Sequence, residues 1–289
     1  ATERDLEAYM EANGYLEKKR DELMDQWGID PVPDEELPPV GTLGFRIQRY
    51  DMKTWGDLFN ARQKLALITF TEKIRQAHQE MLKEGYQEDY SKAVTTYLGL
   101  GLDRIADKNS NLCRLIPQTE AIGFTYARNA LPMLWDYIEM NPFTHPSGVK
   151  NISKEIEENL KSISLIAKTN AKVLNGSATS LPFDDEYFDA VFTDPPYYDN
   201  VNYAELSDFF YVWLKRTLSE FYPDLFITHL VPKKEEIVAN PARQGGSKNA
   251  RRFFEENLRS SLKEITRVLK PGGIANIVYA HKTTHGWET

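Results

Sequence analysis

The pattern of hydrophobic and polar positions changes near residue 150. Upstream of it, apolar residues recur at helical spacing and predict three helices, over residues 61–84, 94–105 and roughly 121–140. Asn60 is placed to cap the first helix and Gly85 to end it. Gly99 and Gly101 cost helix stability, so we expect them where helices pack closely. Pro132 predicts a kink in the third helix.

Downstream of residue 150, helical and strand-like segments alternate, which is typical of a parallel sheet covered by helices. The pattern predicts a helix over 153–162, a short strand within 171–177, a strand over 189–193, a helix from Ala204, a long loop over 229–252, a helix to Leu269 and, after a Pro-Gly-Gly turn, a strand over 274–280. We therefore predict an α/β fold class with a mainly helical N-terminal region.

The first 40 residues form a region of their own. Residues 3–27 are highly charged and carry apolar positions that fit a solvated helix, and four prolines within residues 31–39 then predict an extended linker. The predicted organisation is an acidic helix and linker over 1–40, a helical region over 41–148, and an α/β segment over 149–289.

Charge is distributed unevenly along the chain. The net charge is −8, and residues 1–40 hold twelve Asp or Glu against four Lys or Arg, so that residues 41–289 are neutral overall. The acidic balance therefore does not exclude a local basic surface that contacts nucleic acid.

Cysteine content and hydropathy limit the remaining classes. Cys113 is the single cysteine, which excludes internal disulfides and a cysteine-based zinc site within the chain, and we expect no metal. We interpret Cys113 as a packing residue and expect a cytoplasmic location. No apolar run approaches the roughly 20 residues that cross a bilayer, so no membrane partner is expected.

The most informative stretch is residues 189–198, where an apolar run ends in Asp194, Pro195, Pro196 and Tyr197. Ala190, Val191 and Phe192 predict a buried strand, and the two prolines stop it by fixing φ and removing two N–H donors. Ligands of open α/β sheets lie just beyond the carboxyl ends of strands, which is where this tetrapeptide would lie.

Such a peptide suits the chemistry of an amino group on an aromatic ring. The amine lone pair is delocalised into the ring, and two acceptors, the Asp194 carboxylate and the Pro195 carbonyl, would favour a pyramidal nitrogen that can attack an electrophile. Tyr197 offers a face on which a flipped-out base can stack, which contributes roughly 1–3 kcal/mol. A plain turn is the alternative interpretation of four residues.

The tetrapeptide resembles the signature of S-adenosylmethionine-dependent amino-methyltransferases that act on DNA. Residues 198–216, 268–273 and 277–282 are further similar to large prokaryotic adenine-specific DNA methylases with an N-terminal domain of unknown function. The likeness runs from about Gly44 to the end. It implies a Rossmann-like methyltransferase sheet and N6 methylation of DNA adenine, with catalytic roles for Asp194, Pro195, Pro196 and Tyr197.

The resemblance also implies where S-adenosylmethionine binds. Ser177 stands where these enzymes often carry an Asp that contacts the cofactor, and Asp194 is the second expected contact; a simple strand-to-loop turn at Ser177 is an equal alternative. The family's glycine-rich cofactor loop lies upstream of the matched region. We therefore expect an incomplete and inactive piece of a larger enzyme, with an incomplete sheet open to self-association.

Basic residues near the tetrapeptide are candidates for contacts with DNA. The predicted nucleic-acid contacts are Tyr198, Lys233, Lys234, Arg243, Lys248 and Arg251. A mobile basic loop would bind phosphates independently of sequence, and a solvated loop is the alternative. Two further functions stay open: N4-cytosine or RNA amino-methylation, and a non-catalytic nucleic-acid-binding module.

Overall fold

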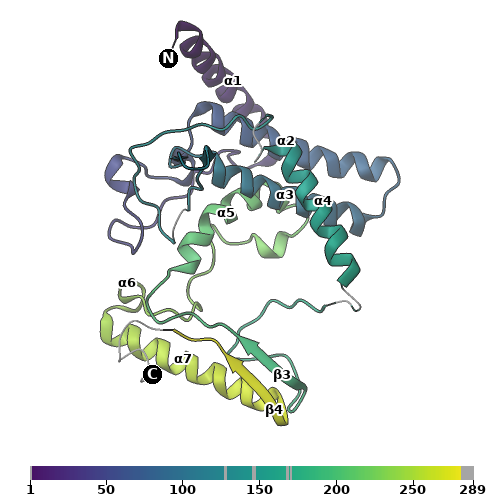
Figure 1. The fold of residues 1–289 in the computed structure, drawn as a ribbon, viewed down its shortest axis with the longest axis vertical. Coiled ribbons are helices and arrows are strands. Elements are labelled where there is room, and N and C mark those ends of the chain that lie inside the picture. Colours follow the sequence, from purple (N-terminus) through teal and green to yellow (C-terminus); the bar gives the residue numbers. More distant parts are fainter. Residues whose placement is uncertain (1, 127–128, 145–147, 167–168, 170, 281–289) are drawn as a thin grey trace. The chain divides into compact units, whose positions relative to one another are not determined.

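The computed structural model describes residues 2–126, 129–144, 148–166, 169 and 171–280, and it shows a mixed α/β chain (Figure 1). Its contacts divide the chain into two compact units. The first unit comprises residues 1–168 and 205–231, and the second comprises residues 169–204 and 232–289.

The first unit is mainly helical in its described part. Its elements are α1 (Glu3–Trp27), α2 (Ala61–Lys83), α3 (Glu88–Lys108), the short strands β1 (Leu115–Ile116) and β2 (Ala121–Ile122), α4 (Val149–Ile166) and most of α5 (Tyr203–Leu218), with 3₁₀ turns at Ile47–Tyr50, Trp55–Leu58 and Pro223–Leu225. One hydrophobic core, which includes Trp55, Leu67 and Trp213, joins the helices to the segment 32–59.

Helix α1 confirms the helix predicted for the acidic start of the chain. Thr2 caps it, since its hydroxyl accepts the Asp5 N–H, and Gly28 ends it in the left-handed conformation. Leu16 and Leu23 are buried against the core, whereas the first half of the helix is exposed.

The proline-rich segment is packed rather than extended into solvent, which differs from the predicted linker. Val32 and Leu37 are buried in the core. The fully buried guanidinium of Arg216 on α5 donates to the Asp30 carbonyl at 2.7 Å and to the Glu35 carboxylate at 2.9 Å. A buried arginine needs acceptors for its donors, and this segment supplies them.

The helix pair α2 and α3 confirms the predictions made from capping and glycine. Asn60 caps α2, and its side chain accepts the Gln63 N–H at 3.0 Å. A Cβ added at Gly99 would lie 3.2 Å from Leu218, and one at Gly101 would lie 3.1 Å from Ile152 of α4. Both glycines therefore permit close approach of neighbouring helices.

The prediction of a helix over residues 121–140 is wrong for the described residues of this stretch, which are 121–126 and 129–140. Ala121 and Ile122 pair with β1, and Leu131 bridges to Phe45, donating its N–H to the Gly44 carbonyl at 2.8 Å. Trp135, one of the large apolar residues in this stretch, is 87% exposed. Pro132 lacks the N–H that a helix interior requires, so the helical spacing of apolar residues did not decide the structure here.

The second unit contains a parallel pair of strands with one long helix. Strands β3 (Phe188–Thr193) and β4 (Leu269–Ile277) pair in parallel, and the crossover between them includes α6 (Pro241–Gln244) and α7 (Ser247–Val268). The register shifts between Phe188 and Ala190, where β4 bulges through its Pro-Gly-Gly sequence. Gly272 takes a φ of +79°, which side chains rarely adopt, and this bulge replaces the predicted turn before the strand.

Three expectations for the second unit differ from the structure. No strand forms over residues 171–177, where no described strand pairs with the segment. The predicted loop over 229–252 is partly helical, because Asn240 and Pro241 start α6 and Gly246 leads into α7. Strand β3 is not buried: Phe192 is 75% exposed, since the described sheet has only two strands and lacks a layer over this side.

Candidate functional site

The tetrapeptide at 194–197 lies directly beyond the carboxyl end of β3, as predicted. The hydrogen bonds between β3 and β4 continue up to the residue before Asp194, since the Val278 N–H donates to the Thr193 carbonyl at 2.9 Å. Asp194 is exposed, whereas Pro195, Pro196 and Tyr197 are half-buried. The sheet therefore presents the Asp194 carboxylate to solvent from a fixed backbone.

Asp194 and Tyr197 are joined by a hydrogen bond. The Tyr197 hydroxyl donates to Asp194 Oδ1 at 2.6 Å, and this bond raises the pKa of Tyr197. The other Asp194 oxygen and the Pro195 carbonyl accept no hydrogen bond within the described part of the chain. Two acceptors are thus available to a ligand while the Tyr197 hydroxyl is bonded to the carboxylate.

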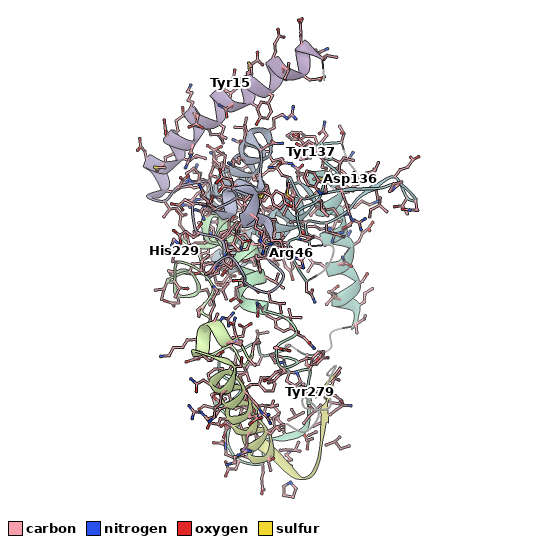
Figure 2. All side chains as sticks on the ribbon, turned by 90° about the vertical axis from the view of Figure 1, so that its left-hand side faces the viewer. Tyr15, Arg46, Asp136, Tyr137, His229 and Tyr279 are labelled. Carbon is pink, nitrogen blue, oxygen red and sulfur yellow. The ribbon has the colours of Figure 1, made fainter. Side chains whose placement is uncertain are left out.

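Tyr279 is a neighbour of the site that the sequence did not single out. Its ring, labelled in Figure 2, meets the Tyr197 ring edge to face, with centroids 5.7 Å apart. It follows β4 by two residues, so the register of the parallel pair brings it to the end of β3. Tyr279 lies in the stretch 277–282 that carries the family resemblance; His281 and Lys282 of that stretch lie outside the described residues.

Tyr198 has a packing role in this structure. Its φ is +55°, which turns the chain sharply after Tyr197, and its ring packs edge to face on Phe254 of α7 at 5.2 Å. Burial raises the pKa of Tyr198. The ring belongs to a small apolar cluster built on Ala239, Ala250 and Phe254.

The predicted phosphate contacts divide into engaged and exposed side chains. Arg243 on α6 forms an ion pair with Glu236, and Arg251 on α7 pairs with Glu255 at 2.5 Å. Lys248 is exposed in the first turn of α7, and Lys233 and Lys234 lie in the segment before α6. Two of the five predicted basic contacts, Arg243 and Arg251, are therefore already engaged by carboxylates.

Ser177 lies in a turn of its own. Its hydroxyl is 2.8 Å from the Thr179 hydroxyl and accepts the Thr179 N–H at 3.3 Å. It makes no hydrogen bond to the tetrapeptide within the described residues. The strand that was expected to present Ser177 to a cofactor is absent, so the turn interpretation describes its geometry.

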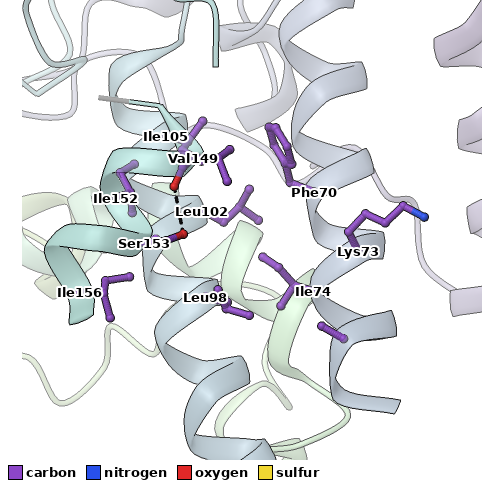
Figure 3. Close-up of a pocket in the computed structure, with 12 residues that line it drawn as sticks. Phe70, Lys73, Ile74, Leu98, Leu102, Ile105, Val149, Ile152, Ser153 and Ile156 are labelled. Carbon is purple, nitrogen blue, oxygen red and sulfur yellow. Dashed lines mark hydrogen bonds between the residues drawn. The ribbon is translucent and has the colours of Figure 1, made fainter. Parts of the chain in front are cut away.

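The first unit contains an apolar cavity of about 220 Å³ between α2, α3 and α4 (Figure 3). The hydroxyl of Ser153 donates to the Val149 carbonyl at 3.0 Å, and Lys73 reaches Gln76 at 2.9 Å. The polar groups around the cavity therefore bond to their own helices. The cavity offers apolar packing and no reactive side chain.

Other classes of site find little support in the described residues. No cluster of three His, Cys, Asp or Glu side chains suited to a metal ion occurs among them. Cys113 is a buried thiol, and burial raises its pKa. Within the described part of the chain, every helix is too short or too polar to cross a membrane.

Comparisons with known proteins add no relative. A scan of protein-family models, a search of curated proteins and a search of solved structures each returned no match to this chain.

Proposed function

We propose that the protein transfers a methyl group from S-adenosylmethionine to the exocyclic amine of adenine in DNA, on a Rossmann-like sheet. One observation carries the proposal: the end of β3 holds an exposed carboxylate, two prolines and a tyrosine bonded to that carboxylate. Ligands of α/β sheets bind at this end of the strands.

The amine chemistry rests on the two available acceptors. An adenine amine carries two N–H bonds, which the free Asp194 oxygen and the Pro195 carbonyl can accept. This pairing concentrates the lone pair on nitrogen and stabilises the positive charge that develops during attack. The prolines fix both acceptors before the base arrives, so little reorganisation is needed in the transition state.

Tyr197 supplies the surface for the base. Its hydroxyl is tied to Asp194, and its ring contacts Tyr279 edge to face. Two fixed contacts restrict rotation of the ring. A flipped-out base that stacks on it would gain roughly 1–3 kcal/mol.

The described residues do not complete a site for S-adenosylmethionine. The Ser177 hydroxyl is engaged with Thr179, and the close backbone approach at Gly273 is to the Asp189 carbonyl rather than to open space. The chain's own contribution is therefore limited to holding and polarising the amine, and no step is assigned to cofactor contacts.

The same observation favours a second candidate, a non-catalytic nucleic-acid-binding module that keeps the tetrapeptide for its shape. Within enzymes, the N4 amine of cytosine or an RNA amine would suit the same acceptors. Analysis of methylated nucleosides separates these candidates, because N6-methyladenine in DNA, N4-methylcytosine, a methylated ribonucleoside and unmodified nucleic acid are distinct products.

The test compares the full-length protein with its Asp194→Ala and Asp194→Asn variants, using labelled S-adenosylmethionine and duplex DNA. We expect N6-methyladenine from the parent and a loss of about 10²–10³-fold in kcat for Ala, since an electrostatic contact to the reacting group is removed. Asn keeps the shape and loses the charge, so it should retain part of the activity. A folded parent protein that leaves adenine unmodified, or an Ala variant at full activity, contradicts the proposal.

A further inference from the structure

We propose that Glu236 and Arg243 form a positioning pair that fixes the segment 198–204 behind the tetrapeptide, and that Arg243 does not bind a phosphate. The expected effect of this pair on kcat rests on the proposed function. The expected ordering of the segment 198–204 does not, because it follows from contacts within the second unit alone.

Glu236 uses both carboxylate oxygens in this role. Oε1 accepts the N–H of Ala204, in the first turn of α5, at 2.8 Å, and Oε2 forms the ion pair with Arg243. The side chains of Arg243 and Glu236 are only 17% and 12% exposed. A carboxylate at a helix N-terminus is stabilised by the helix dipole, and the guanidinium balances its charge where water is scarce.

Arg243 is itself held by the short helix α6. The Asn240 side chain accepts the N–H groups of Ala242 at 3.1 Å and Arg243 at 3.3 Å. The Gln244 side-chain carbonyl in turn accepts the Asn240 N–H at 2.8 Å. The guanidinium also donates to the Lys233 carbonyl at 3.4 Å, so the segment 233–244 closes on itself.

This closed segment is joined to the tetrapeptide at its other end. The Ala239 N–H donates to the Tyr198 carbonyl at 2.9 Å, and Ala239 packs in the cluster that holds the Tyr198 ring. The Asn200 N–H donates to the Tyr197 carbonyl at 3.1 Å. The segment after Tyr197 is thus attached at Tyr198 and again at Ala204, with Glu236 and Arg243 supporting the second attachment.

An engaged arginine is poorly suited to a phosphate contact. Moving Arg243 onto DNA would leave Glu236 as a largely buried carboxylate without its cation, which is costly. A positioning role and a phosphate role therefore predict different losses. Displacement of reacting groups lowers kcat, whereas loss of a phosphate contact lowers the salt dependence of DNA affinity.

The experiment compares Arg243→Gln and Glu236→Gln with Lys248→Gln, an exposed cation of α7 that was predicted to contact phosphate. For the first two variants we expect faster amide hydrogen exchange in peptides covering 198–204, a kcat about 10- to 100-fold lower, and an unchanged slope of log affinity against log salt. For Lys248→Gln, we expect the slope to fall by about 0.9. Exchange in peptides from α2 serves as the folding control.

The outcomes separate the two proposals. Unchanged exchange over 198–204, or an Arg243→Gln slope that falls by about 0.9, overturns the positioning role. A parent protein without methyl transfer overturns the proposed function, and the exchange result then still decides whether the pair positions the segment. Arg243→Lys, which keeps the charge next to Glu236, should restore slow exchange.

Discussion

Asp103 shows how one buried side chain sets a pH dependence. It lies on α3 with 6% of its surface exposed, and burial, together with the nearby Asp107 carboxylate, raises the pKa of Asp103 well above its usual range. The folded state therefore holds this proton more tightly than the unfolded state does. The contribution of Asp103 to the free energy of unfolding is therefore fully present below the unfolded pKa of about 3.9. It is lost as pH rises through the folded pKa.

We predict that Asp103→Asn removes this loss. In the parent protein the group lowers the free energy of unfolding by about 1.4 kcal/mol per pH unit between its unfolded and folded pKa values. The neutral amide should make the variant more stable than the parent above this window and flatten its pH profile. Urea unfolding at several pH values measures this, with the exposed Asp25→Asn as control. Parallel profiles for parent and Asp103→Asn would refute the prediction.

Gly56 is a position where an added methyl group has no room. Its Cβ would lie 2.5 Å from the Pro33 carbonyl oxygen and 2.9 Å from Val32 Cγ1. The same carbonyl accepts the Gly56 N–H at 2.8 Å, so the backbone cannot move away without losing that bond. This close approach holds the proline-rich segment against the core.

We predict that Gly56→Ala destabilises the first unit by about 1–3 kcal/mol, the usual cost of overpacking. Gly14→Ala is the matched control, because nothing lies within 4 Å of its added Cβ and it is within helix α1. There, alanine should stabilise by up to about 1 kcal/mol. Thermal unfolding of both variants should therefore shift in opposite directions, and equal shifts would contradict the argument.

At the scale of elements, the sequence predicted structure where local signals agreed. Asn60 and the apolar stripe that follows it both indicated α2, and the glycines of α3 marked close packing. Over residues 121–140 the signals conflicted, since a helical stripe contained Pro132, and tertiary pairing of Leu131 with Phe45 prevailed. The periodicity of apolar residues alone does not show whether a helix or such a tertiary pairing will form.

In the candidate site, too, the sequence predicted the local contacts but not those between distant residues. Asp194 and Tyr197 are neighbours in sequence, so the prediction that they lie together beyond a strand required only local reasoning. The ion pair between Glu236 and Arg243 was hidden, because in a segment of mixed charge the sequence does not say which residues pair. Tyr279 reaches Tyr197 only through the strand register, which no local pattern reports.

Helix α7 supplies a prediction at this scale. Lys248, Arg252, Arg259 and Lys263 are exposed at intervals of four, seven and four residues, which places them on one face over about 22 Å. None forms an ion pair with an acidic side chain within the described residues. Such a row of cations suits a nucleic-acid backbone if the proposed function holds.

We predict that a triple variant, with Arg252, Arg259 and Lys263 each changed to Gln, lowers the slope of log affinity against log salt for duplex DNA by about 2 to 3. A control variant changes Lys154 and Lys161 of α4, which are paired with Glu158 and Glu157. This control should keep the parental slope. An unchanged slope in the triple variant would show that this face of α7 is solvated and does not contact DNA.

At the scale of the whole molecule, the sheet of the second unit is the feature that most needs a partner. Phe192 and Ile274 are 75% and 67% exposed, and the register Ala190 to Ile274 and Phe192 to Asn276 places them on the same face. Parallel strands are ordinarily covered on both faces, and exposed apolar patches favour association.

We therefore predict that the chain self-associates through this face. Sedimentation over a range of concentrations should show mass action, and Phe192→Lys with Ile274→Lys should abolish it. Val40→Lys, which changes an exposed apolar residue of the first unit, should leave it intact. A parent chain that stays monomeric throughout would mean that this face is stable in water, contrary to the physical expectation for a parallel pair.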